Sequence, residues 1–242
     1  MHKKEFGLLS LPVIVAALGF FVDVFDLLLF GIVRKPSLRE LGLSDEAILS
    51  EGELLLSVQM TGMMLGGIVW GILGDKKGRL KVLFGSILLY SIANIANGFV
   101  QTTGQYTVIR FIAGFGLAGE LGAGITLTSE ILAKEKRGLA ATVIAVCGVL
   151  GGISAALLYS GIGDWRMLYF IGGGLGLALL ILRIAVAESS MYDTVKKSSV
   201  QLGNFLQFFT SKARFNRFMR GILIVLPVWY IICILVSFAA QL

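Results

Sequence analysis

Residues 110–138 read RFIAGFGLAGELGAGITLTSEILAKEKRG, a stretch apolar for long enough to cross a bilayer that nevertheless contains Arg110, Glu120 and Glu130. A charge at membrane depth is costly unless it is paired or in contact with water. The glycines of the stretch lack side chains, so neighbouring helix backbones can approach closely. The stretch therefore predicts a tightly packed spanning helix that faces water or a charged partner, in a protein that handles polar cargo or protons.

The composition of the whole chain is that of an integral membrane protein. Of 242 residues, 56% are hydrophobic and 15% are charged, whereas soluble domains are roughly one quarter charged. We attribute the formal charge of +6 to cytoplasmic connections and do not expect nucleic-acid binding. Cys147 and Cys233 lie within apolar runs, and the only histidine is His2, so we expect no disulfide and no metal site.

About seven apolar stretches are long enough to span a bilayer. They cover residues 8–33, 54–74, 82–100, 107–130, 139–160, 166–187 and 221–242. The connection 34–53 between the first two is rich in acidic residues and is expected to be an exposed extracytoplasmic segment.

The distribution of Lys and Arg predicts the orientation of these spans. Most of them lie in the N-terminus and in the connections 75–81, 131–138 and 188–220. The opposite side holds only Arg34, Lys35, Arg39 and Arg166. Basic residues favour the cytoplasmic side, so we expect a cytoplasmic N-terminus in a protein of the bacterial inner membrane.

The first span contains two acidic residues, Asp23 and Asp26, three positions apart and therefore on one helical face. The apolar LLLFGIV that follows favours a helix that continues through the membrane; the alternative is a helix that ends near Gly19 and leaves both carboxylates in solvent. With a rise of about 1.5 Å per residue, Asp26 and Arg110 lie at similar depths, and Glu120 lies near the midplane. We expect an Asp26–Arg110 pair, which leaves one acidic group to exchange a proton.

Other residues of the spans are expected to serve packing or the membrane interface. In the second span, two pairs of glycines at spacing four predict packing seams: Gly62 with Gly66, and Gly67 with Gly71. Gln59 and Thr61 either face a cavity or lie at the interface. At the end of the sixth span, Arg183 is expected to reach the cytoplasmic headgroups.

A short charged turn, GILGDKKGRLKVLF at residues 71–84, follows the second span. Asp75 suits the N-terminal end of the third helix, where the helix dipole favours an anion, and Gly78 allows a tight turn. A solvated loop with orienting charges explains the lysines but does not explain the spacing of Gly71, Asp75, Gly78 and Arg79. That spacing resembles the loop between helices 2 and 3 of the major facilitator superfamily.

Further motifs resemble the same superfamily and one of its branches. Arg110 followed by Gly114 is similar to the superfamily's helix 4 motif. FFVDVFD in the first span, Glu130, and KRG at 136–138 resemble the metabolite:proton symporter branch and its phosphate- and sugar-transporting relatives.

The resemblance implies an all-α integral membrane fold of twelve helices in two six-helix halves, with substrate bound between them. Residues 1–187 correspond to the N-terminal six-helix half. Residues 188–220 are expected to form a cytoplasmic linker with an amphipathic surface helix, and 221–242 a seventh transmembrane helix that starts the second half. The chain is therefore expected to be a truncated or split gene product that requires a second six-helix half.

The implied function is proton-coupled symport of a small polar metabolite, an organic acid, a sugar or a phosphate, by alternating access. The expected substrate and proton pathway consists of Asp23, Asp26, Arg110 and Glu120. The expected conformational gating motif consists of Gly71, Asp75, Gly78, Arg79, Glu130 and Arg137. Facilitated diffusion, efflux and a non-transporting half-transporter are the alternatives. The sequence contains no metal-ligand cluster, nucleophile constellation or Walker-type loop, so we expect neither an enzyme nor a cofactor; the expected partners are substrate, proton and membrane lipid.

Overall fold

The computed structural model describes residues 11–131, 134–183 and 210–230, and within these ranges the chain forms seven helices. They are α1 (Leu11–Glu40), α2 (Asp45–Lys77), α3 (Arg79–Asn97), α4 (Thr103–Ile131), α5 (Lys134–Ile162), α6 (Trp165–Arg183) and α8 (Lys212–Tyr230). The all-helical prediction is confirmed, with one helix in the region of each expected span.

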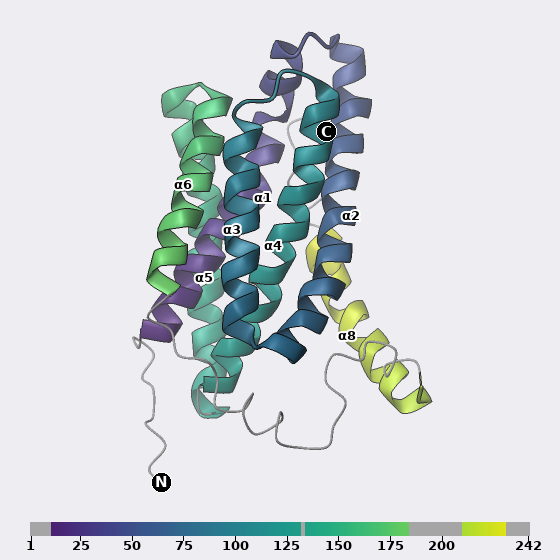
Figure 1. The fold of residues 1–242 in the computed structure, drawn as a ribbon, viewed down its shortest axis with the longest axis vertical. Coiled ribbons are helices and arrows are strands. Elements are labelled where there is room, and N and C mark those ends of the chain that lie inside the picture. The colour runs from purple at the N-terminus through teal and green to yellow at the C-terminus, as the bar shows by residue number, and fades with distance from the viewer. Residues whose placement is uncertain (1–10, 132–133, 184–209, 231–242) are drawn as a thin grey trace.

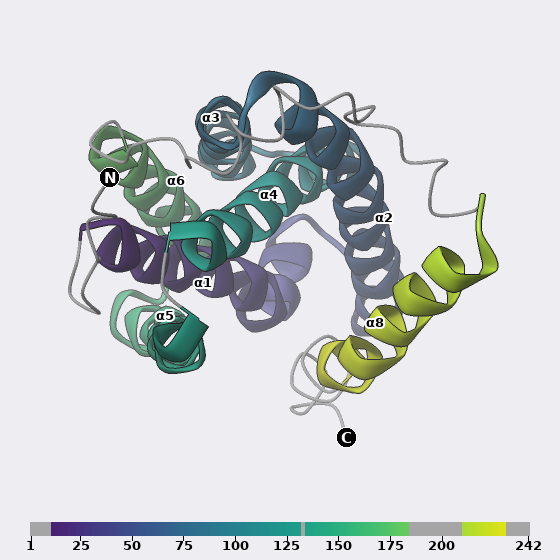
Figure 2. The same ribbon diagram turned by 90° about the horizontal axis from the view of Figure 1, so that it is seen from below.

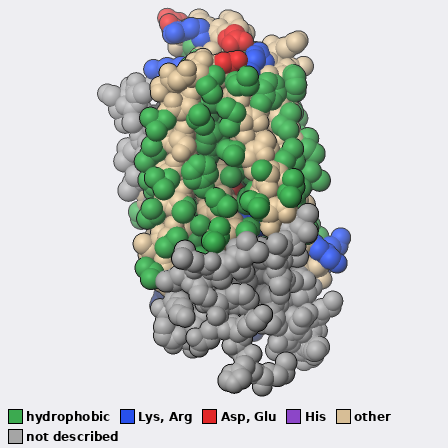
Figure 3. Space-filling view, turned by 90° about the vertical axis from the view of Figure 1, so that its left-hand side faces the viewer, with side chains coloured by type: hydrophobic (Ala, Val, Ile, Leu, Met, Phe, Trp, Pro, Cys, Tyr) green, Lys and Arg blue, Asp and Glu red, His purple; other side chains and the backbone are tan. Residues whose placement is uncertain are grey.

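Helices α1 to α6 run up and down along the long axis of an antiparallel bundle (Figure 1). Among the described residues, four helices are long and apolar enough to cross a membrane: Val13–Glu40, Asp45–Lys77, Gly138–Ile162 and Trp165–Arg183. Figure 3 shows hydrophobic side chains over the wall of the bundle and charged side chains gathered at its upper end. An apolar wall with charged ends is the surface of a multi-pass integral membrane protein.

The first two helices extend well beyond the predicted apolar spans. Helix α1 continues through Pro36 to Glu40, and α2 begins at Asp45. Ser44 caps α2 by accepting a hydrogen bond from the Ala47 amide at 3.4 Å, and Asp45 and Glu46 occupy the first turn, where the helix dipole favours acids. The connection expected at 34–53 is therefore mostly helical, because capping and dipole effects extend helices into polar sequence that hydropathy does not mark.

The contacts between the six helices are related by an internal symmetry. Helix α4 packs on α2 and α3, while α1 packs on α5 and α6, and the pairs α1–α4 and α3–α6 are also in contact. Exchanging the first three helices for the last three maps this set of contacts onto itself. Inverted repeats of this kind are typical of transporter folds and surround their binding sites.

Glycines bring the tightest helix pairs into backbone contact. A Cβ atom on Gly62 or Gly66 of α2 would collide with carbonyl oxygens of α4, and one on Gly151 of α5 would collide with the Phe21 carbonyl of α1. The packing seam predicted for the second span is confirmed at these two positions of α2. It is wrong for Gly67 and Gly71, where nothing lies within 4 Å, because these two glycines are on another face of the helix.

Helix α8 lies beyond α2 at the edge of the bundle in both Figure 1 and Figure 2, and its described side chains are mostly exposed. It runs from Lys212 through Pro227 to Tyr230, across the expected boundary at residue 220. The basic segment and the start of the expected seventh span are thus one helix. The part of the expected linker at 188–209 lies outside the described residues.

Candidate functional site

Two groups of charged side chains lie in the core of the bundle. The first, which we call the Arg110 cluster, consists of Asp26 (α1), Gln59 (α2), Asn94 (α3) and Arg110 (α4), all fully buried. Arg110 donates a hydrogen bond from Nη2 to Gln59 Oε1. Its guanidinium carbon lies 4.8 Å from the centroid of the Phe30 ring, a cation–π contact.

The Arg110 cluster leaves hydrogen-bonding groups unused. Nε and Nη1 of Arg110 and both carboxylate oxygens of Asp26 have no hydrogen-bond partner among the described residues. Asp26 interacts electrostatically with Arg110 and faces the Asn94 side chain. Buried polar groups are normally satisfied, so a core region with several unpartnered groups is a candidate for binding a ligand or a proton.

The expected Asp26–Arg110 pair is not formed, and this prediction is wrong at the level of contacts. The hydrogen bond of Arg110 goes to Gln59 instead. The reason is lateral packing: Gly114, one turn from Arg110, lies directly against the Gln59 backbone of α2. Equal depth along two helix axes does not decide which side chains meet.

The second group, which we call the Arg183 cluster, consists of Asp23 (α1), Tyr90 (α3), Glu120 (α4) and Arg183 (α6). Arg183 Nη2 and Glu120 Oε1 form a buried ion pair. Asp23 interacts electrostatically with both members of this pair and with Asp26, while its Oδ1 has no hydrogen-bond partner in the described part of the chain. Asp23 and Asp26 of α1 thus belong to different clusters and interact with each other electrostatically.

Two expectations about this region are settled. The helix does not end near Gly19, because α1 continues and leaves Asp23 only 2% exposed. Arg183 does not reach the headgroups, because it is 1% exposed and bound to Glu120. The sequence did contain a signal for this pair, since a carboxylate within a span requires a cation and Arg183 ends an apolar run.

Sequence reasoning left three polar residues out of the predicted pathway, although it considered a cavity-facing position for Gln59. Gln59 is the hydrogen-bond partner of Arg110, and Tyr90 and Asn94 are fully buried next to the clusters. Tyr90 and Asn94 both come from helix α3. It contributes because it packs on both α4 and α6, which no local pattern in the sequence reveals.

Aromatic residues close one side of the Arg110 cluster. The hydroxyl groups of Tyr106 and Tyr169 lie 2.6 Å apart, and the Tyr169 ring centroid is 5.7 Å from the Arg110 guanidinium carbon. Trp165 packs against both tyrosines. This aromatic wall separates the cluster from the end of the bundle.

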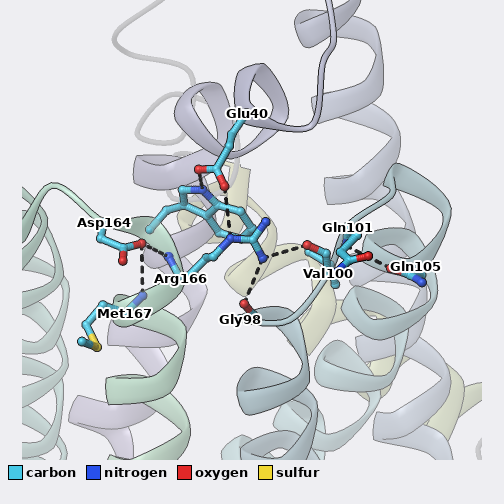
Figure 4. A network of polar contacts seen from close by, with 9 residues as sticks. Glu40, Gly98, Val100, Gln101, Gln105, Asp164, Arg166 and Met167 are labelled. Atoms are coloured by element: carbon cyan, nitrogen blue, oxygen red, sulfur yellow. Dashed lines mark hydrogen bonds and ion pairs between the residues drawn. The ribbon is translucent and has the colours of Figure 1, made fainter.

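At that end, Arg166 joins three helices (Figure 4). Its Nε donates to Glu40 Oε1 at 3.1 Å, and its Nη1 donates to the carbonyl oxygens of Gly98 and Val100 at 3.0 and 2.8 Å. Trp165 Nε1 donates to the other Glu40 oxygen at 2.6 Å. We call this group the Arg166 clasp; it holds the last turn of α1 and the end of α3 to the start of α6.

The expected gating motif lies around the turn between α2 and α3, at the opposite end of the bundle. Gly78 has a φ of 99° and donates its amide to Gly74 O, which confirms the tight turn. Asp75 lies in the last turn of α2 and not within α3. The side chains of Arg79, Glu130 and Arg137 lie outside the described part.

No group of three or more His, Cys, Asp or Glu side chains within residues 11–131, 134–183 and 210–230 is placed to hold a metal ion. Within the Arg110 and Arg183 clusters, the described charged groups form one ion pair, Arg183–Glu120, and one cation–amide contact, Arg110–Gln59. Chemically, such groups can bind and release protons and can bind a charged or polar solute.

The chain is similar to known transport proteins. It is 34% identical over 161 residues to a Haemophilus influenzae protein provisionally named a metabolite transport protein, covering 65% of this chain and 38% of the relative. It is 28% identical over 202 residues to the benzoate transport protein of Acinetobacter baylyi, covering 80% of this chain and 42% of the relative. The chain thus spans less than half the length of these relatives.

A solved structure has the same fold. The inward open conformation of the xylose transporter XylE from E. coli superimposes with a TM-score of 0.67 at 17% identity, over 89% of this chain and 56% of that one. The family model described as Major Facilitator Superfamily matches residues 14–242. Since this match covers nearly all of the sequence, the chain belongs to the Major Facilitator Superfamily, a family of membrane transporters and not of enzymes.

Proposed function

We propose that this chain is the N-terminal part of a secondary active transporter that moves a small polar metabolite together with a proton by alternating access. The observation that carries the proposal is Asp26, a fully buried carboxyl group beside Arg110 to which the described residues donate no hydrogen bond. Residues 1–187 form one half around the substrate, and a second six-helix half after the linker completes the binding site.

The physical argument concerns the cost of burying charge. A carboxylate buried without a hydrogen-bonded cation is costly, and the group avoids the cost by holding a proton. Asp26 can therefore bind a proton when the site is closed and release it when water reaches the site. Asp23 and Glu120 belong to the same pathway.

Arg110 supports an organic acid as the substrate class. Its Nε and Nη1 are unpartnered among the described residues, and a guanidinium binds a carboxylate through two parallel hydrogen bonds. The benzoate transport protein among the relatives is named for an aromatic acid. Phosphate offers a guanidinium the same geometry and is the second candidate, and a sugar is the third.

The remaining assignments follow the same proposal. The protein lies in the bacterial inner membrane in contact with lipid, with its N-terminus and the turn at Gly78 on the cytoplasmic side. The residues at and near that turn, together with Glu130 and Arg137, control closure of the cytoplasmic end. The basic residues at 76, 77, 79 and 81 support this orientation.

Proteoliposome uptake tests the proposal. The chain is reconstituted alone and together with the continuation of its reading frame, and uptake of organic acids, phosphate and sugars is measured with and without an inward proton gradient. We expect gradient-driven accumulation of one solute by the completed protein and loss of that accumulation in Asp26→Asn. Thr61→Ala is the control, because Thr61 is exposed and its hydroxyl bonds only to the backbone of its own helix.

Other outcomes decide between the alternatives. Uptake that does not depend on the proton gradient would indicate facilitated diffusion. Export of the solute against its own gradient, driven by inward movement of protons, would indicate efflux. Failure of every form to move any solute, with the protein folded, would identify a non-transporting half-transporter.

A further inference from the structure

We propose that Arg183 is a counter-ion shared by Glu120 and Asp23, and that these three side chains form a second proton-binding site distinct from Asp26 and Arg110. The site deepens the proposed function, and its role in transport rests on that function. Its existence is a property of this chain alone and can be tested without uptake.

Three helices bring the three side chains together. Asp23 comes from α1, Glu120 from α4 and Arg183 from α6, and none of them is more than 2% exposed. Arg183 Nη2 is hydrogen-bonded to Glu120, and Asp23 interacts electrostatically with the pair while its Oδ1 has no hydrogen-bond partner among the described residues. Arg183 is thus paired with Glu120, while the carboxyl group of Asp23 lies beside the pair.

The charge balance of the site calls for one proton. Two ionised carboxylates and one guanidinium leave a net charge of −1 in the core, and one bound proton makes the site neutral. Since Glu120 holds the ion pair, the proton belongs to Asp23 in this conformation. A neutral Asp23 beside a neutral ion pair removes the cost of an uncompensated buried charge.

Among the described side chains, Arg183 is the cation that acts on Asp23. Its charged or titratable neighbours are Asp26 on its own helix, Tyr90 from α3, Glu120 from α4 and Arg183 from α6. The helix α5 also packs on α1, but its residues 138–162 include no acidic or basic side chain. Arg110 interacts instead with Asp26.

Gly19 is the residue that lets the site form. It lies four positions before Asp23 and therefore on the same face of α1. A Cβ atom on Gly19 would collide with Arg183 Nη2 and with Glu120 Oε1. The missing side chain allows the ion pair to lie directly against α1, within reach of Asp23.

The site also has the capacity to rearrange. Glu120 Oε2, Arg183 Nε and Tyr90 Oη have no hydrogen-bond partner among the described residues. When Asp23 loses its proton, it competes with Glu120 for Arg183. Such an exchange ties α6 more closely to α1 and loosens it from α4, which couples proton release to helix position.

A double-mutant cycle in the full chain tests whether the counter-ion is shared. Glu120→Gln and Asp23→Asn are made singly and together, and the unfolding temperature is measured in one detergent. We expect a small loss for each single variant, because Arg183 keeps one carboxylate. The double variant should lose more than the sum, because Arg183 is then buried without a counter-ion. Asp26→Asn combined with Glu120→Gln is the matched control and should be additive.

Infrared spectroscopy of the same variants tests where the proton lies. The band of a buried protonated carboxyl group should be weaker in Asp23→Asn than in the unmodified chain. It should also weaken in Glu120→Gln, because Asp23 then ionises against Arg183. A cycle that is additive, or a band unchanged by Asp23→Asn, would overturn the proposal.

Two further variants protect the test against a simple failure to fold. Arg183→Gln should be destabilised, and adding Glu120→Gln to it should restore stability, because the remaining Asp23 is neutral. Absence of this rescue would also overturn the proposal. These readouts do not involve transport. Uptake without proton dependence would therefore refute the proposed function but not this site. Failure of these readouts would refute this site but not the proposed function.

Discussion

Arg110 and Arg183 are among the largest fully buried side chains of the described bundle, and they are held in different ways. Arg183 is paired with a carboxylate, which makes a neutral group. Arg110 donates a hydrogen bond to the neutral amide of Gln59 and stacks on the Phe30 ring. Asp26 interacts with the charge of Arg110 electrostatically, without a hydrogen bond. A guanidinium keeps its charge at all ordinary pH values, so of the two cations Arg110 is the one suited to an anionic solute.

Removing the partner of Arg110 should be costly. In Gln59→Ala a buried cation loses its hydrogen bond, and we expect the free energy of unfolding to fall by about 1–3 kcal/mol. Chemical denaturation in detergent micelles measures this change. Thr61→Ala, two residues along the same helix but exposed, should stay within about 0.5 kcal/mol. Equal effects of the two substitutions would show that Gln59 does not hold Arg110.

At the scale of helices, backbone contact between α2 and α4 fixes the site. Gly62 and Gly66 of α2 lie on carbonyl oxygens of Phe111 and Phe115, and Gly114 of α4 lies on the Gln59 carbonyl. Without a hydrophobic driving force between helices in lipid, such close packing is what holds them together. The same contact places the Gln59 side chain next to Arg110.

Gly62→Ala and Gly67→Ala form a matched pair that tests this seam. A methyl group at position 62 meets backbone atoms that cannot move independently, and we expect a loss of about 1–3 kcal/mol of stability. At position 67 it meets nothing within 4 Å, and the better helix propensity of alanine should give a gain of about 0.5–1 kcal/mol. Unfolding of both variants in the same detergent measures the difference; effects of the same sign would contradict the packing described.

At the scale of the whole molecule, the connections α1–α2, α3–α4 and α5–α6 meet at one end of the bundle, and the Arg166 clasp ties them together (Figure 4). The clasp thereby joins α1 and α3 of the first three-helix repeat to α6 of the second. Because the clasp makes this end rigid, we expect the six helices to move as one body during a change of conformation.

Arg166→Lys should loosen this end of the bundle. Lysine keeps the charge but cannot donate to Glu40, Gly98 and Val100 at once, so we expect local opening to become easier by about 1–3 kcal/mol. Hydrogen exchange of the amides near residues 98–102 measures this opening.

Arg39→Lys is the matched control for this prediction. Arg39 pairs with Asp45 at the same end, but the two side chains are 66% and 75% exposed. Exposed ion pairs contribute little to stability and are screened by salt, so the exchange should change little. Similar effects of the two substitutions would argue against the clasp as a special contact.

The sequence by itself determined where the helices lie, because apolar content and run length are local properties; of the seven expected spans, four are helices long and apolar enough to cross a membrane among the described residues. It also determined that Asp23 and Asp26 are buried, since the apolar residues after them hold α1 in the bilayer, and that Gly62 and Gly66 form a seam. The tight turn at Gly78 was also predictable from the sequence, because a positive φ favours glycine.

Only the tertiary structure decided which charge meets which partner. Depth along the helix axes favoured Asp26 as the partner of Arg110, yet the packing of α2 on α4 places Gln59 beside it. Helices α4 and α6 both pack on α1 and α3, and this arrangement brings Arg183 to Glu120. These choices depend on the lateral positions of helices that are far apart in the sequence. Hydropathy and spacing within one helix describe depth and facing direction, but not the neighbour on that face.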